Sequence, residues 1–169
     1  MALSMHSATV PVFVRNLQNL LTWLDKAQAH ADARGFDAVN YLQLRLAPDM
    51  LPFIKQIQIA SDTAKGCVAR LAGVDIPKWD DNESTLDDLR GRIRRTLDYV
   101  QGFDEPRLAG SDTREVVLTL RSGEVRFAGQ RFVEHWALPN FYFHVTTAYA
   151  LLRHNGVELG KADYLGALK

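Results

Sequence analysis

The sequence predicts an all-α protein, a four-helix bundle with a small β-hairpin inserted before the last helix. Apolar residues recur at threes and fours in four long segments, one short segment alternates apolar and polar residues, and glycines follow the helical segments as stop signals. Four amphipathic helices of this length can bury their apolar stripes around one core. A chain of 169 residues has the length of one domain, so we expect a single domain over residues 1–169.

The first helix is expected to end at Gly35, with Ser4 or Ser7 as its cap. Pro11 lies either in its first turn or at a kink. Its apolar stripe consists of Val10, Phe13, Leu17, Leu20, Leu24, Ala27 and Ala31. These positions fall on one side of a helix and predict one buried face.

The second helix is expected from about Pro48 to Leu71, before Gly73, because prolines are tolerated best in a first helical turn. Residues 74–83 form a long crossover loop. The stripe of the second helix consists of Ile54, Ile57, Ser61, Ala64, Val68 and Leu71.

The third helix starts at the capping sequence Ser84–Asp87 and ends at Gly102. Its stripe consists of Leu86, Leu89, Ile93, Leu97 and Val100. Four arginines of this segment are interleaved with aspartates, which favours a solvated face. They are Arg90, Arg92, Arg94 and Arg95.

The last helix is expected from near Gly129 to Gly156, with a bend or a new start at Pro139. Its stripe consists of Phe141, Val145, Ala148 and Leu152. Before it, residues 116–120 and 125–127 alternate apolar and polar side chains around a turn at 121–124. This period of two predicts a β-hairpin, which needs the bundle to support it because two strands alone are marginal.

Composition excludes several classes of function. Twenty basic and twenty acidic residues leave no net charge, which argues against nucleic-acid and anionic-membrane partners. No apolar run is long enough to span a bilayer, and the start of the chain does not resemble a secretory signal. The single cysteine, Cys67, excludes an internal disulfide and lies among small apolar residues typical of a buried thiol. We therefore expect a cytoplasmic protein.

His144 is the residue that most suggests chemistry, because helical spacing places it on the inward face of the last helix, four residues after Asn140. Three interpretations stay open: a zinc or nickel ligand, a hydrogen-bonded core histidine, and part of a metal-free ligand pocket. A metal needs further imidazoles or carboxylates, and asparagine is a poor substitute. No cofactor is therefore predicted, with a divalent metal as the alternative.

The aromatic residues of the last helix spread around its circumference, so some must face outward. They are Trp136, Phe141, Tyr142, Phe143 and Tyr149. Together with Trp23, the outer members suggest a partner surface, and a homodimer is the simplest hypothesis.

The sequence resembles the DinB/YfiT-like superfamily of metalloenzymes, and in particular a bacterial branch of unknown function. The resemblance rests on "LAPDMLPFIKQIQIASDTAKG", "RLAGVDIPKWDDNE" and "ALPNFYFHVTTAYALLRHNGVELGKADYLG". It implies a DinB-type four-helix bundle, commonly a dimer. It also implies three histidines around a divalent ion, one from the second helix and two spaced i, i+4 on the last.

Only one of these three ligand positions holds a histidine here. His144 matches the later position on the last helix, Asn140 stands at the earlier one, and Gln58 or Gln56 stands on the second helix. We therefore expect a bundle that binds a small molecule in a central cavity near His144 without a tightly held metal. The ligand site is expected to comprise His144, Asn140, Gln58, Asp62, His135 and Tyr142.

Two other functions remain open, so whether the protein is an enzyme is left undecided. One is a divergent metal- or thiol-dependent transferase or isomerase, as among characterised members of the superfamily, with His144 as ligand or general base. The other is an interaction module whose dimer surface is the function.

Overall fold

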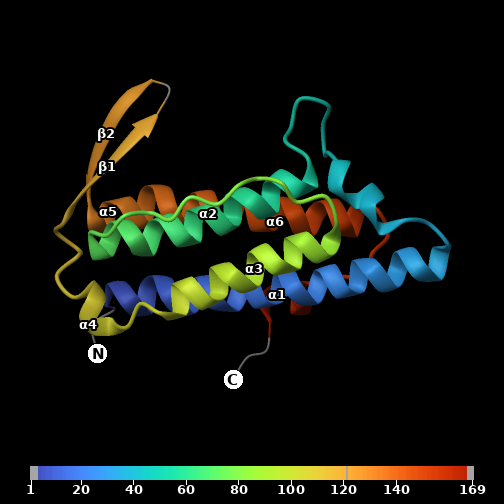
Figure 1. The fold of residues 1–169 in the computed structure, drawn as a ribbon, viewed down its shortest axis with the longest axis horizontal. Coiled ribbons are helices and arrows are strands. Elements are labelled where there is room, and N and C mark those ends of the chain that lie inside the picture. The colour runs from blue at the N-terminus through green and yellow to red at the C-terminus, as the bar shows by residue number, and fades with distance from the viewer. Residues whose placement is uncertain (1–3, 121, 167–169) are drawn as a thin grey trace.

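The protein folds as a bundle of long helices with a two-stranded hairpin at one end (Figure 1). A computed structural model describes residues 4–120 and 122–166. Around the bundle, the first long helix contacts the third, the third the second, the second the last, and the last the first. These helices are α1 (Met5–Arg34), α2 (Phe53–Ala72), α3 (Leu86–Gln101) and α6 (Leu138–His154).

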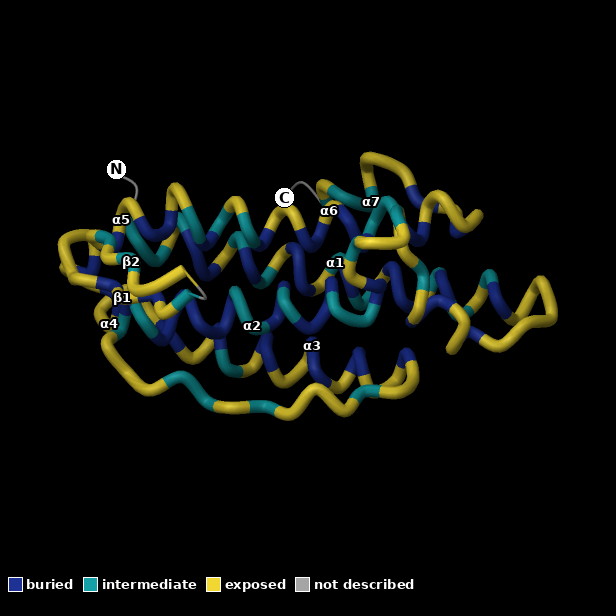
Figure 2. The backbone as a smooth tube through the Cα atoms, turned by 90° about the horizontal axis from the view of Figure 1, so that it is seen from above, coloured by how far each residue is buried: buried dark blue, intermediate teal, exposed yellow. Residues whose placement is uncertain are grey.

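The expected apolar stripes form the core, as the buried faces of the tubes in Figure 2 show. Every stripe residue expected on α1, α3 and α6 is buried, and on α2 only Ile54 is partly exposed. The buried hydrophobic residues make one cluster that includes residues from all four long helices. Since burial of a large apolar side chain contributes about 1.5–3 kcal/mol, this cluster is the main source of stability.

Capping residues fix where α1 and α3 begin. Ser4 caps α1, and its side chain and that of Ser7 each accept from the other's backbone N–H. Thr85 caps α3, one residue later than the predicted start at Ser84. Asp88 is its reciprocal partner in the capping box. Gly35 ends α1 in the left-handed conformation, which glycine adopts without steric cost.

Helix α2 begins five residues later than the prediction of Pro48. Pro52 lies before its first turn with extended backbone, and a hydrogen bond from the Phe53 amide to the Leu44 carbonyl closes the preceding loop. That loop follows a short 3₁₀ helix, η1 (Ala38–Gln43), which has no sequence periodicity to reveal it. The crossover 74–83 is irregular, as predicted.

The last helical segment is continuous but changes its hydrogen-bond pattern before Pro139. It consists of α5 (Gly129–Phe132), a π-helical turn η2 (Val133–Ala137) and α6. Proline has no N–H to donate one turn back, so a change of pattern at this point is physically reasonable. Of the two alternatives expected at Pro139, the structure has the new start: α6 begins at Leu138, directly after the π-helical turn, with Pro139 in its first turn.

The hairpin pairs β1 (Glu115–Leu120) with β2 (Gly123–Ala128) in antiparallel register. Leu120 is paired with Gly123, so only two residues separate the strands. The expected four-residue turn is too long, because Gly123 and Glu124 belong to β2. Arg121, its first residue, lies outside the described residues. At the base of the hairpin, a Cβ on Gly129 would lie 1.9 Å from the Ser111 carbonyl oxygen, so only glycine fits this approach.

Two further short helices are α4 (Glu105–Leu108) and α7 (Lys161–Leu165). Helix α7 covers Trp23, whose indole N–H donates to the Asp163 carbonyl at 3.2 Å and whose ring stacks on Tyr164. Trp23 is only 1% exposed, which corrects the expectation that it faces a partner.

Among the described residues, no helix is both long enough and apolar enough to cross a membrane.

Candidate functional site

His144 lies in the seam between α6 and α2, where its ring pairs with a glutamine of the facing helix. The His144 Nδ1 atom lies 2.7 Å from Gln56 Oε1, and both side chains are buried. The amide nitrogen of Gln56 donates to the Leu51 carbonyl at 2.8 Å, which fixes the orientation of that amide. Its oxygen therefore faces the imidazole as an acceptor.

This arrangement determines the protonation of the ring. An amide oxygen only accepts, so Nδ1 of His144 must carry the hydrogen and Nε2 keeps its lone pair. Burial lowers the pKa of His144 below its usual 6.5, which holds the ring neutral at pH 7. No hydrogen-bond partner of Nε2 occurs within residues 4–120 and 122–166, and the ring retains slight exposure.

Asn140 lies one turn before His144 and bonds the same facing helix. Its amide nitrogen donates to the Thr63 hydroxyl oxygen at 2.8 Å, and both side chains are half-buried. Thr63 also lines a pocket of about 220 Å³ that the hairpin and Trp136 close from the other side. The seam thus runs from the closed His144–Gln56 pair to this open pocket.

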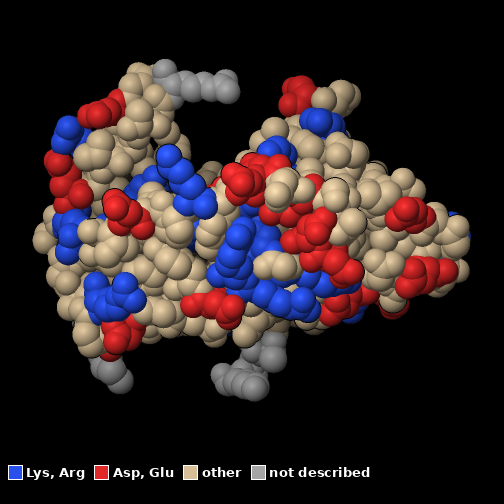
Figure 3. Space-filling model, viewed as in Figure 1, with Lys and Arg blue, Asp and Glu red and all other residues tan. Residues whose placement is uncertain are grey.

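The expected central cavity is not found beside His144, because Phe141, Val145 and Ala148 fill the bundle interior there at 0% exposure. The hollow that reaches the seam is at the surface instead. In Figure 3 the surface is hollowed between the hairpin and the segment before α2.

Gln58 and Asp62 lie on another side of α2, which corrects their expected place beside His144. The Gln58 amide nitrogen donates to Glu83 of the crossover at 2.7 Å. Asp62 faces Arg92 of α3 at 3.0 Å and Lys65 at 2.8 Å, although its outer part borders the pocket beside Thr63. Gln56, the other residue considered for the α2 position, is the one that meets His144.

Arg92 is the centre of an ionic cluster between α2, α3 and the crossover. Its fully buried guanidinium lies within 3.0 Å of three carboxylates, and that of Glu83 is itself buried. Burial alone would lower the pKa of Arg92, but the carboxylates outweigh it and raise that pKa. Acidic and basic side chains intermingle on this face of the molecule (Figure 3).

The cluster corrects the expectation of a solvated arginine face. Arg90 and Arg92 are buried, whereas Arg94 and Arg95 are exposed. Arg90 contacts Asp25 of α1 and donates to the Leu24 carbonyl. The sequence feature that indicates this burial is the acidic end of the crossover, whose Asp81 and Glu83 pair with Arg92 of α3.

His135 and Tyr142 do not join His144. His135 is exposed on η2, and no hydrogen bond joins its ring to another described residue. Tyr142 is 38% exposed and, with Phe143 and Leu46, lines an apolar hollow of about 380 Å³ on the outer side of α6. Burial is the main cause that raises the pKa of Tyr142.

The donor set at His144 does not fit a zinc or nickel ion. Gln56 already uses its amide oxygen on the imidazole, and Asn140 directs its amide nitrogen at Thr63. Within the described residues, no group of three or more His, Cys, Asp or Glu side chains is arranged to hold a metal ion. Since such ions require several imidazoles, thiolates or carboxylates, one free nitrogen is too few.

Cys67 is buried, and desolvation raises the pKa of its thiol far above the usual value. The thiolate, which is the nucleophilic form, is therefore not available there.

The packing of the long helices and the hairpin before the last helical segment define a DinB-like helical protein. The chain belongs to the DUF1993 family, a domain of unknown function, whose model matches residues 5–165. It is similar to a crystal structure of a DinB family member from Shewanella denitrificans, with 46% identity and a TM-score of 0.92. The match covers 97% of this chain and 93% of that one. Among curated proteins no match was found.

Proposed function

We propose that the protein binds a small polar molecule at the α2–α6 seam, with His144 Nε2 as the hydrogen-bond acceptor and without a tightly held metal. The observation that carries the proposal is the Gln56 contact, which fixes the tautomer and leaves one lone pair free. Nε2 has no partner among the described residues and is not fully buried, so it can accept a hydrogen bond from a small molecule that reaches the seam.

The surroundings suggest what kind of molecule fits. A neutral imidazole accepts from a hydroxyl, amide or thiol hydrogen, and the same lone pair can take up a proton as a general base. The Asn140–Thr63 pair lies between His144 and the pocket at the hairpin, so it would contact the rest of the ligand. An enzymatic role for His144 would use this same geometry.

The first experiment separates a metal-free site from a metal site. Protein prepared without a histidine tag is expected to contain less than stoichiometric zinc or nickel, and added zinc is expected to bind no more tightly when His144 is present than in His144→Phe. Stoichiometric metal that is lost in His144→Phe would overturn the proposal.

The second experiment looks for the ligand interaction itself. Phenol, acetamide and 2-mercaptoethanol are titrated while imidazole nitrogen signals are followed by NMR. At least one probe should shift Nε2 of His144 in a saturable way, with a weaker response in Asn140→Ala. Tyr142→Phe, on the outer side of α6, serves as the matched control and should not change the response.

A homodimer is the second candidate, favoured by the apolar hollow on the outer side of α6. Phe143 is 56% exposed, Leu46 44% and Tyr142 38%, and large apolar side chains exposed together are typical of interfaces. Sedimentation at micromolar concentration should show a dimer that dissociates in Phe143→Ser. A monomer at all concentrations would contradict this candidate.

A further inference from the structure

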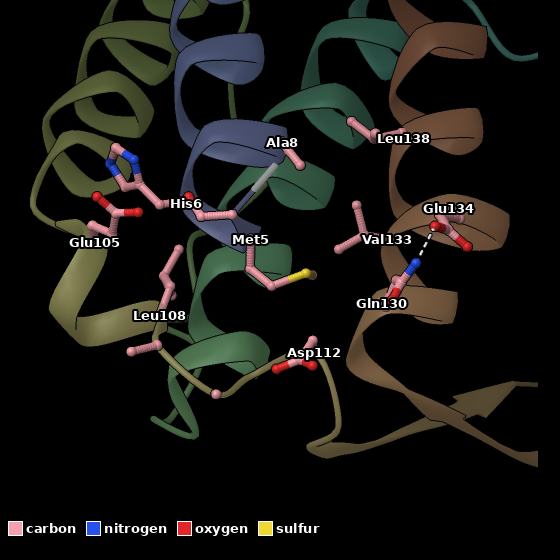
Figure 4. A pocket seen from close by; sticks show the side chains of 13 residues that line it. Met5, His6, Ala8, Glu105, Leu108, Asp112, Gln130, Val133, Glu134 and Leu138 are labelled. Atoms are coloured by element: carbon pink, nitrogen blue, oxygen red, sulfur yellow. Dashed lines mark hydrogen bonds between the residues drawn. The ribbon is translucent and has the colours of Figure 1, made fainter. Parts of the chain in front are cut away.

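A pocket separate from the seam lies where the start of α1 meets α4 and the α5–η2 segment. Its volume is about 500 Å³, within the range usual for small-molecule sites. In Figure 4, Met5 of α1 and Val133 of η2 face each other across it, with Leu108 of α4 to the left of Met5. These side chains give the pocket apolar walls.

The formally charged residues that line this pocket are all acidic. Its described lining contains the carboxylates of Glu105, Asp112 and Glu134, with His6 as the sole basic-type side chain and neither lysine nor arginine. Glu134 accepts from the Gln130 amide at 2.7 Å, which holds it at the rim (Figure 4). No cation is paired with these three carboxylates among the described residues.

The partial positive charge at the N-terminus of α1 does not outweigh the negative charge of the pocket. A helix N-terminus carries about half a positive charge, against a formal charge of −3 from the carboxylates. In addition, the capping box of Ser4 and Ser7 uses polar groups that would otherwise bind an anion.

We propose that this pocket binds an organic cation with an apolar body, such as an alkylammonium group carried on a short hydrocarbon chain. The chain would lie between Met5 and Val133, and the ammonium would lie at the rim, where carboxylates stand on separate sides of the pocket (Figure 4). Apolar burial supplies most of the affinity, and the carboxylates select the sign of the ligand charge.

Three probes of equal chain length test the proposal on the full chain: n-hexylamine, n-hexanol and hexanoate. Followed by amide NMR, n-hexylamine should give saturable shifts at Ala8, Gln130 and Val133. Affinity for n-hexanol should be about tenfold lower, because the charge contact is lost, and hexanoate should be weaker still. Equal binding of the amine and the alcohol, stronger binding of hexanoate, or no saturable shift would overturn the proposal.

Variants test whether the rim carboxylates cause the preference for the amine over the alcohol. The double substitution Glu105→Gln with Glu134→Gln should reduce amine affinity to that of the alcohol, while alcohol affinity stays the same. Glu115→Gln with Glu124→Gln, on the hairpin outside the pocket, is the matched control and should change neither. Ala8→Phe, which fills the pocket, should abolish binding of both probes. If the rim variant keeps the amine preference, the proposal is wrong.

Discussion

Helix α2 presents buried polar side chains to two neighbours, and the two contacts differ in kind. Toward α6 the contact is neutral: one amide and one imidazole, with one ring nitrogen unused. Toward α3 and the crossover it is ionic, with the Arg92 guanidinium surrounded by carboxylates from two elements. The ion pairs of the Arg92 cluster thus lie on one side of the helix.

The two contacts suit different roles: the ionic contact stabilises the fold, and the neutral contact can take up a ligand. Buried ions are costly unless they are paired, so the Arg92 cluster holds the crossover against the bundle and has little freedom to take a ligand. A neutral pair costs less to bury and leaves an acceptor available. This difference supports the proposal that a ligand binds on the α6 side.

The largest expected effect comes from breaking the ionic side. Arg92→Met leaves the buried Glu83 carboxylate without its cation, which should cost about 3 kcal/mol of unfolding free energy. Urea denaturation measures the loss. Arg126→Met, which removes exposed hairpin ion pairs, is the control and should cost less than about 0.5 kcal/mol. Equal losses of unfolding free energy in the two variants would mean that the Arg92 cluster stabilises the fold no more than exposed ion pairs do.

Breaking the neutral side should cost less. Gln56→Leu leaves the Nδ1 hydrogen of His144 without an acceptor, and we expect a loss of about 2 kcal/mol in the same urea measurement. Combining it with His144→Phe removes both polar groups. The double variant should then be more stable than the sum of the single losses predicts, by about 1 kcal/mol. Strict additivity would show that the two residues do not interact.

The pH dependence of stability should reflect the lowered pKa of His144. Its folded pKa is below 6.5, so as the pH falls through 6.5 the unfolded chain takes up a proton before the folded one does. The contribution of His144 to stability is therefore lost as the pH decreases below 6.5, and at higher pH it stays constant. The loss should be smaller in His144→Phe, as measured by urea unfolding at a series of pH values. Parallel pH profiles would contradict the lowered pKa.

The smallest effects are expected at the outer edges of both contacts. Asn140→Ala removes a half-buried hydrogen bond to Thr63 and should cost about 1 kcal/mol. Lys55→Ala removes a half-exposed ion pair with Asp81 and should cost about 0.5 kcal/mol or less. Thermal unfolding of both variants makes the test. A Lys55 loss larger than the Arg92 loss would reverse the proposed order.

Periodicity predicted the long helices well because their apolar faces repeat over many turns. The inward position of His144 followed from the same repeat. The short helices η1, α4 and α7 complete too few turns to produce such a signal, and the π-helical turn was visible only through Pro139. The start of α2 was placed too early because prolines mark the region of a helix start but not its exact residue.

The composition of the site was harder to predict. Gln56 and Gln58 are two positions apart, about 200° around the helix, so only the arrangement of neighbours decides which one meets His144. Asp62 was assigned to the wrong side because its partner, Arg92, comes from a different helix, 30 positions away in the chain. Such pairings depend on tertiary packing and leave no local pattern.

The contact of α7 with α1 joins segments about 140 residues apart, through Trp23, Lys26 and Asn19. Contacts of such long sequence separation close a large loop and have to wait until the intervening helices are in place. The indole of Trp23 therefore reports on the completion of folding. Its fluorescence should change in the last kinetic phase, after helix formation has already been detected by circular dichroism.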